Sequence, residues 1–153
     1  MDVEIERKFL VKDDTWRTRA SEGLVCRQGY IVSDKKKTVR VRVIGEQGFL
    51  TVKGATDGIS RMEFEYEIDS PDAEYMLMLC ERHVEKTRYL VDHAGMKWEV
   101  DVFEGANAGL VMAEVELESE DQEIELPAWA GEEVSDDPRY YNAYLAAHPF
   151  SGW

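Results

Sequence analysis

Charged and apolar residues alternate in several short runs along the chain, which is the pattern of a β-strand with two different faces. The run at residues 3–9 reads VEIERKF, and side chains two positions apart in a strand share a face. Glu4, Glu6 and Lys8 therefore point one way, and the apolar residues between them point the other way. The same alternation recurs at residues 38–43, 49–53, 61–67, 86–89, 99–102 and 114–118.

This pattern predicts eight strands, at about 3–11, 25–32, 37–44, 47–53, 60–68, 84–92, 96–103 and 110–118. The segments 45–48 and 92–95 contain glycine and have the length of hairpin loops. A sheet with one solvated face explains a single alternating strand. It explains less well that acids and bases occupy separate strands, so we expect a mainly β (α+β) fold in which eight antiparallel strands close into a barrel with a charged interior.

Four short helices are expected between or after the strands. Asp13 and Asp14 could cap a helix over 15–20, and Ser70 followed by Pro71 is typical of a helix start. Residues 119–122 resemble a capping box before a short helix, and a last helix is expected from Pro138 to about Ala147. We expect the helices to cover the apolar outer faces of the strands.

Length and composition narrow the classes of protein to consider. The 153 residues fit one domain spanning 1–153, and the net charge of -14 comes mainly from residues 101–153, which hold one basic and 13 acidic residues. Without a large basic exterior, nucleic-acid binding is not expected. Two cysteines form no disulfide framework or metal motif, the charged first residues do not resemble a signal peptide, and no apolar run has membrane-spanning length. A cytoplasmic protein without a membrane partner is expected by default.

The inward faces of the predicted strands carry both cations and carboxylates. The expected cations are Lys8, Arg40, Arg42, Lys53 and Arg88, with Arg61 and Lys86 as further candidates. The expected carboxylates are Glu4, Glu6, Asp101, Glu114 and Glu116. Arginine and lysine bind phosphate oxygens, but bare carboxylates would repel them. A divalent ion resolves this conflict, and Mg²⁺, or Mn²⁺ in its place, binds carboxylates together with phosphate oxygens. Two further charged runs have simpler explanations, since 63–67 could be a solvated face and 35–37 a solvated loop.

Seven motifs in order resemble those of the CYTH superfamily, the triphosphate tunnel metalloenzymes. They include the ExExK signature at residues 4–8, TVRVR at 38–42, LTVKG at 50–54 and AEVEL at 113–117, and together they cover nearly the whole chain. The resemblance implies a closed eight-stranded barrel that forms a tunnel for a triphosphate and a divalent metal. It also implies that the five carboxylates are metal ligands, that the cations bind substrate, and that a C-terminal helix can close one mouth of the tunnel.

The resemblance leaves several alternatives open for the activity. The chain is similar to short bacterial members that act on inorganic tripolyphosphate, so we expect hydrolysis to pyrophosphate and phosphate. An adenylyl cyclase, a nucleoside or thiamine triphosphatase, and a non-catalytic polyphosphate sensor are the alternatives. Lys86 could take a proton from the attacking water, directly or through Tyr30, or it could clamp a phosphate. The sequence leaves the oligomeric state open, with a homodimer as one option.

Overall fold

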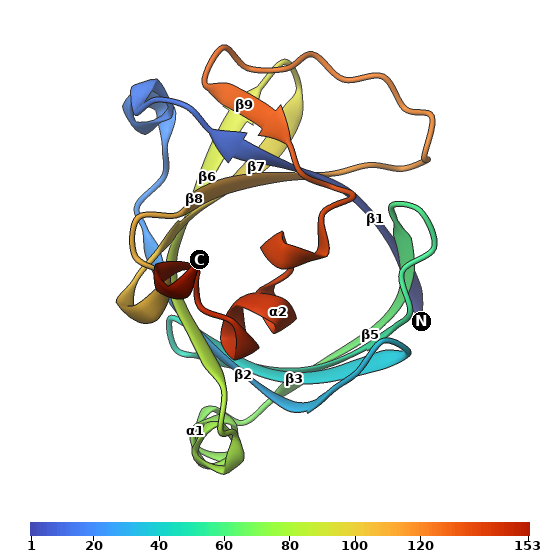
Figure 1. Cartoon of the computed structure of the whole chain (residues 1–153), viewed down its shortest axis with the longest axis vertical. Helices are drawn as coiled ribbons and strands as arrows, with labels where there is room; N and C mark the ends of the chain where they lie inside the picture. Colours follow the sequence, from blue (N-terminus) through green and yellow to red (C-terminus); the bar gives the residue numbers. More distant parts are fainter.

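The computed structural model describes all of residues 1–153 and contains one closed antiparallel β-barrel. The strands follow one another around the sheet in the order β5-β4-β3-β2-β6-β7-β8-β1-β9, and β1 also pairs with β5. This extra pairing closes a ring of eight strands, which Figure 1 shows end-on, and leaves β9 outside the ring. The strands are β1 (Asp2–Val11), β2 (Leu24–Ser33), β3 (Lys37–Ile44), β4 (Gln47–Gly54), β5 (Ser60–Ile68), β6 (His83–His93), β7 (Met96–Phe103), β8 (Val111–Glu116) and β9 (Ala130–Glu133).

The eight predicted strands and the closed barrel are confirmed, with two differences. β8 ends at Glu116, whereas the alternation in the sequence continues to residue 118. β9 was not expected, because it is only four residues long and shows no alternation; it pairs with the end of β1 across a shift in register.

The apolar faces of most strands point outward and are covered there. Trp98 of β7 and Phe9 of β1 pack with Trp16 and Trp129 in the largest apolar cluster. Trp16 belongs to the 3-10 helix η1 (Thr15–Arg19), which confirms a short helix after Asp13 and Asp14. The loop between β8 and β9 brings Trp129 to the same face. The segment at 119–122 is a turn, so the helix expected there is absent: the Gln122 side-chain oxygen accepts from the Glu118 backbone N–H and closes the turn.

Helix α1 (Ser70–Leu79) covers a second part of the outer face, as expected. Its Ala73 and Leu77 pack against Val41 and Val43 of β3. The helix begins as the Ser-Pro pair predicts, although Asp69, not Ser70, occupies the N-cap position. No helix of the structure is long and apolar enough to cross a membrane.

The C-terminal segment departs from the expectation that all helices lie outside the barrel. It agrees instead with the C-terminal helix that the family resemblance places at one mouth of the barrel. It forms η3 (Pro138–Tyr140), α2 (Asn142–Ala147) and η4 (Phe150–Gly152), and Figure 1 shows α2 within the outline of the barrel opening. The cause is a change in the inward residues, which become apolar at this end of the barrel. Leu145 of α2 is fully buried there, in a cluster with Val84, Phe103, Leu110 and Met112.

Candidate functional site

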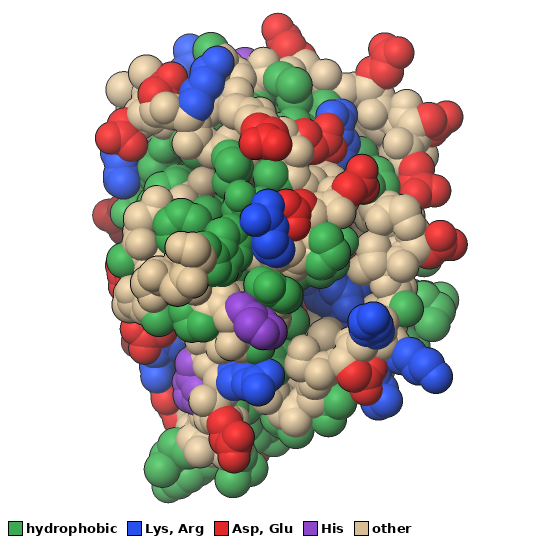
Figure 2. Space-filling model, viewed as in Figure 1, with side chains coloured by type: hydrophobic (Ala, Val, Ile, Leu, Met, Phe, Trp, Pro, Cys, Tyr) green, Lys and Arg blue, Asp and Glu red, His purple; other side chains and the backbone are tan.

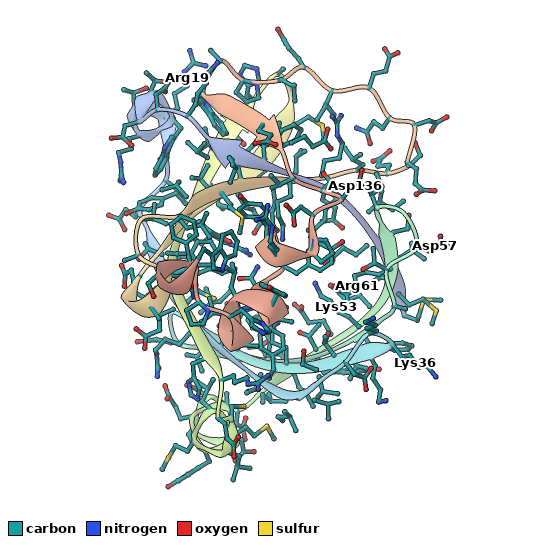
Figure 3. All side chains as sticks on the ribbon, viewed as in Figure 1. Arg19, Lys36, Lys53, Asp57, Arg61 and Asp136 are labelled. Atoms are coloured by element: carbon teal, nitrogen blue, oxygen red, sulfur yellow. The ribbon has the colours of Figure 1, made fainter.

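A cavity of about 990 Å³ runs through the charged middle of the barrel. It is lined by inward residues of every strand of the ring and by Tyr141, Asn142 and Tyr144 of the C-terminal segment. Figure 2 shows a hollow beside this segment with Lys and Arg side chains in and around it. In Figure 3, Lys53 of β4 and Arg61 of β5 point into the open part of the barrel, whereas Lys36 points away from it. The exposed position of Lys36 agrees with the loop expected at 35–37.

The charges of the cavity are divided between two halves of the barrel. Strands β4, β3, β2 and β6 form what we call the basic half, which contributes Lys53, Arg40, Arg42, Lys86 and Arg88. Strands β7, β8, β1 and β5 form the acidic half, which contributes Glu99, Glu114, Glu116, Glu4, Glu6, Glu63 and Glu65, with Asp101 of β7 behind the cavity surface. Lys8 of β1 and Arg61 of β5 are the two cations of the acidic half. This division follows from the sequence, because each inward face that is charged carries mostly one sign of charge, and the inward face of β2 is uncharged.

The basic half contains buried guanidinium groups with unused donors. The Nε atoms of Arg40 and Arg42 are buried and have no hydrogen-bond partner. The Glu65 carboxylate lies 3.7 Å from the Nη2 atom of each arginine, which is too far for a hydrogen bond. The Thr51 hydroxyl oxygen accepts one hydrogen bond of 3.3 Å from Arg40 Nη2. Burial, with the nearby Arg40 and Arg88, lowers the pKa of Arg42 to about 10. An anion between these arginines would satisfy both unused donors and relieve their mutual repulsion.

The acidic half contains carboxylates that face one another across paired strands. Glu6 of β1 pairs with Glu116 of β8, and Glu99 of β7 pairs with Glu114 of β8. Like charges directly opposite each other are destabilising. Burial, followed by the carboxylates of Glu114 and Glu4, raises the pKa of Glu6 to about 8. Burial also raises the pKa values of Glu99 and Glu116.

These carboxylates fit a divalent cation by their chemistry, since a cation between them would replace repulsion with attraction. In the structure itself, no three acidic, histidine or cysteine side chains come together as a ready-made metal site. One reason is that several carboxylates are already paired with lysines. Lys53 donates to Glu4 at 3.0 and 3.1 Å, and Lys8 lies 3.4 Å from Glu114.

The pairs with lysine explain why the pKa values of Glu4 and Glu114 are lowered, whereas that of Glu6 is raised. Burial acts to raise the pKa of Glu114, but the nearby Lys8 outweighs it, so that this pKa is lowered. The pKa of Glu4 falls to about 2 against the effect of burial, through hydrogen bonds with Glu63 and Lys53. Burial, helped by that bond to Glu4, raises the pKa of Glu63 to about 7.

Asp101 has surroundings that differ from those of the other predicted metal ligands. The residue is 2% exposed and does not line the cavity. Its two oxygens accept from Arg88 Nε and Nη2 at 2.8 and 2.9 Å, and Lys86 Nζ lies 2.9 Å away. Asp101 therefore neutralises two buried cations of the neighbouring strand. Its role as a metal ligand stays a prediction, and the occupied oxygens do not favour that role.

Lys86 is held as firmly as Asp101. Besides the ion pair, its Nζ donates to the Asn142 side-chain oxygen at 2.9 Å, so helix α2 contacts a cation of the basic half. Lys8 also reaches the C-terminal segment, where its Nζ donates to the Tyr140 carbonyl at 3.0 Å. The C-terminal segment is thus attached to two lysines of the cavity and is part of its wall.

The structure brings all but one of the predicted site residues to the surface of the same cavity, and only Asp101 lies behind it. The predicted residues that line it are Glu4, Glu6, Lys8, Tyr30, Arg40, Arg42, Lys53, Arg61, Lys86, Arg88, Glu114 and Glu116. The predicted set did not include Glu63, Glu65 and Glu99, which also line it. The two-residue period could have found Glu99, which shares a face with Asp101. Asn142 gave no such signal, because it follows the last strand.

Comparisons with known proteins agree with this geometry. The sequence model of the CYTH domain family matches residues 2–141 of this chain. A protein of Acetivibrio thermocellus named inorganic triphosphatase is 49% identical over 155 residues, covering 100% of this chain and 99% of its own length. A protein of Nitrosomonas europaea with the same name is 42% identical over 151 residues, covering 94% and 97%. The crystal structure of the inorganic triphosphatase NE1496 superposes with a TM-score of 0.68 at 39% identity, covering 95% of each chain.

Proposed function

The chain belongs to the family of CYTH-domain proteins, and from this premise we propose that it hydrolyses inorganic tripolyphosphate to pyrophosphate and phosphate inside its barrel. The observation that carries the proposal is the pair of buried arginine Nε donors without partners in a cavity whose opposite side is lined by repelling carboxylates. A polyanion bound together with divalent cations satisfies both sides at once. The two relatives named inorganic triphosphatase match nearly the full length of the chain, which supports this substrate over larger ones.

The basic half binds the phosphate chain in this proposal. Arg40 and Arg42 use their free Nε donors for phosphate oxygens. Arg88 is held by Asp101 through Nε and Nη2 and by Glu99 through Nη1, and it offers the remaining hydrogens of its two Nη atoms. Lys53 and Lys8 are paired with Glu4 and Glu114 in the present structure. They can contact phosphate once a cation takes over those carboxylates. Arg61, which donates to the Gly54 carbonyl and lines the same cavity, completes the set of substrate contacts.

The acidic half holds the divalent metal. Triphosphatases of this family are metal-dependent, and we propose Mg²⁺, with Mn²⁺ as a substitute, bound by Glu4, Glu6, Glu114 and Glu116. When bound, such an ion neutralises the carboxylates and polarises phosphate oxygens. We leave Asp101 out of this ligand set because Arg88 and Lys86 occupy its oxygens, and we assign it to the positioning of those two cations.

Lys86 acts as a phosphate clamp in this account and not as a general base. A base must accept a proton, whereas Lys86 Nζ already donates to Asn142 and is paired with Asp101. The ammonium therefore presents its remaining hydrogen to the substrate. In the reaction, water attacks a terminal phosphorus atom, the bond to the bridging oxygen breaks, and the two hydrogens of the water are shared between phosphate and pyrophosphate.

The test is a comparison of tripolyphosphate, ATP and thiamine triphosphate as substrates of the purified protein, with product identification, in Mg²⁺, Mn²⁺ and a chelator. We expect equal amounts of pyrophosphate and phosphate from tripolyphosphate, metal-dependent and faster than turnover of the other two. Cyclic AMP from ATP would instead support a cyclase, and binding without turnover of any of the three would support a sensor. Either result would refute the proposal.

A further inference from the structure

Gln28 is a fully buried amide beside the cavity. Its exposed fraction is 0%, and it lies on β2, opposite Arg42 of β3 and Val84 of β6. The two-residue period of the strand places it on the same face as Cys26 and Tyr30. Burial of an amide is costly unless its polar atoms are hydrogen-bonded, so the partners of Gln28 matter.

Both partners come from its own strand. The Gln28 Nε2 group donates to the Tyr30 hydroxyl oxygen at 3.0 Å, and the Cys26 thiol donates to Gln28 Oε1 at 3.5 Å. An amide NH₂ group can only donate, so the Tyr30 oxygen is the acceptor in this bond. The hydrogen of the Tyr30 hydroxyl must therefore point in another direction.

The surroundings of Tyr30 decide what that hydrogen can reach. Tyr30 lines the cavity, and its hydroxyl donates to no group of the protein. Its partner across the β2–β3 pair is Arg40, a cation that offers only donors. None of the carboxylates that line the cavity accepts from the Tyr30 hydroxyl, so a ligand bound in the cavity can supply the acceptor that this O–H group lacks.

We propose that Gln28 is a positioning residue that directs the Tyr30 O–H bond at a phosphate oxygen of the substrate, an inference that rests on the proposed triphosphatase activity. The role assigned to Tyr30 is then hydrogen-bond donation. It differs from the proton relay considered from the sequence, in which Tyr30 would pass a proton from water to Lys86.

Two substitutions of Gln28 distinguish its effect on the direction of the Tyr30 O–H bond from the effect of its side-chain packing. Gln28→Glu keeps the shape of the side chain but offers an acceptor, which draws the Tyr30 hydrogen away from the cavity. Gln28→Met keeps the length and removes both polar atoms, so the hydroxyl is free to rotate. Tyr30→Phe removes the hydroxyl, and its loss of kcat/KM is the value with which the losses of the Gln28 variants are compared. Gln47→Glu is the matched control, since Gln47 is exposed at the start of β4, where it bonds only to Glu67.

The experiment measures kcat and KM with tripolyphosphate for these variants and for each Gln28 change combined with Tyr30→Phe. Calorimetric binding of imidotriphosphate, a non-hydrolysable analogue with NH bridges, and melting temperature are measured on the same samples. Tyr30→Phe and Gln28→Glu are each expected to lower kcat/KM about ten- to hundred-fold, the usual range for a hydrogen bond to a charged group. Gln28→Met is expected to lose less, and Gln47→Glu less than about two-fold.

The double variants show whether Gln28 acts through Tyr30. If Gln28 acts through Tyr30, either Gln28 change should cost nothing further in the Tyr30→Phe background. Full additivity in both backgrounds, or no loss from either Gln28 change, would overturn the inference. If the wild-type protein binds imidotriphosphate but does not cleave tripolyphosphate, the proposed function fails. The same cycle read from binding affinities then still tests Gln28, with non-additivity in support and additivity against.

Discussion

The basic and acidic halves of the barrel solve the burial of charge in different ways. In the basic half, the guanidinium groups of Arg40 and Arg42 are buried with their Nε donors unused. In the acidic half, burial and neighbouring carboxylates raise the pKa of Glu6 to about 8, so this carboxyl group is largely protonated at neutral pH. Neither half is complete without a ligand of opposite charge. The comparison indicates that the barrel is built for two kinds of ligand, an anion and a cation.

The ion pairs between the halves offset only part of this cost. Arg88 and Lys86 share Asp101, and Lys53 pairs with Glu4. Such buried pairs are weak evidence for stability, because desolvation consumes much of the attraction. They are better understood as the arrangement that keeps the charged groups in place until substrate and metal arrive.

The largest expected effect is loss of the metal from the acidic half. A chelator should abolish turnover. Glu116→Gln should lose most of it while the melting temperature stays near that of the wild type, because an amide at position 116 also relieves the repulsion with Glu4 and Asp2. Glu118→Gln, an exposed change two residues further on, should have no effect. Phosphate release with titrated Mg²⁺ measures both. Full activity in the presence of the chelator would contradict the assignment of the acidic half as the metal-binding side of the barrel.

Asp101→Asn is expected to destabilise the fold more than any change on the cavity surface. It removes the carboxylate shared by Arg88 and Lys86 and leaves two buried cations without their anion. Breaking a buried pair typically costs about 3–5 kcal/mol. Urea unfolding of the metal-free protein measures this loss. An unchanged stability together with weaker Mg²⁺ binding would instead return Asp101 to the set of metal ligands.

Arg40→Ala should weaken the interaction of the basic half with substrate by about 1.5–3 kcal/mol, or roughly ten- to hundred-fold in kcat/KM. Lys36→Ala is the control, because Lys36 points away from the cavity (Figure 3). The two variants are compared in steady-state kinetics with tripolyphosphate. Equal losses from the two changes would show that general charge, and not the inward arginine, attracts the substrate.

The last expected effect concerns stability and not catalysis: it is a pH dependence of the free energy of unfolding in the metal-free protein. The pKa of Glu6 rises from an ordinary 4.5 to about 8 on folding, so the folded chain holds a proton that the unfolded chain releases. The free energy of unfolding should therefore fall as the pH rises from about 4.5 to 8. A change of about 1 kcal/mol moves the melting temperature by about 2–4 °C in a chain of this size. Glu6→Gln should flatten this decline between about pH 5 and 8, and parallel curves for the two proteins would contradict the assignment.

The barrel and most of the cavity could be predicted from the sequence because one period of two residues governs both. Glu4, Glu6 and Lys8 had to share a face, and that face had to meet Glu114 and Glu116 if the barrel closed. The sequence also identified Lys86 as a site residue, but its contact with Asn142 could not be predicted. Its contact with Asn142 depends on where α2 packs, and no local pattern reports a helix that packs into the end of a barrel.

The position of α2 had an indirect signal in the inward residues. Phe103 and Met112 continue the inward faces of β7 and β8 past the charged positions, so that the lumen becomes apolar at one end. An apolar lumen needs an apolar filling, and Leu145 supplies it. Strand β9 had no comparable signal, because four residues with one glycine fit a turn as well as a strand.

A crystal structure of the protein with Mn²⁺ and imidotriphosphate tests the division of the barrel most directly. Anomalous scattering locates manganese independently of the phosphate density. We predict a manganese peak among the carboxylates of β1 and β8, including Glu6 and Glu116, and phosphate oxygens within hydrogen-bond distance of the Nε atoms of Arg40 and Arg42. Manganese found only on the outer surface, or phosphate bound without metal against the acidic half, would contradict the account.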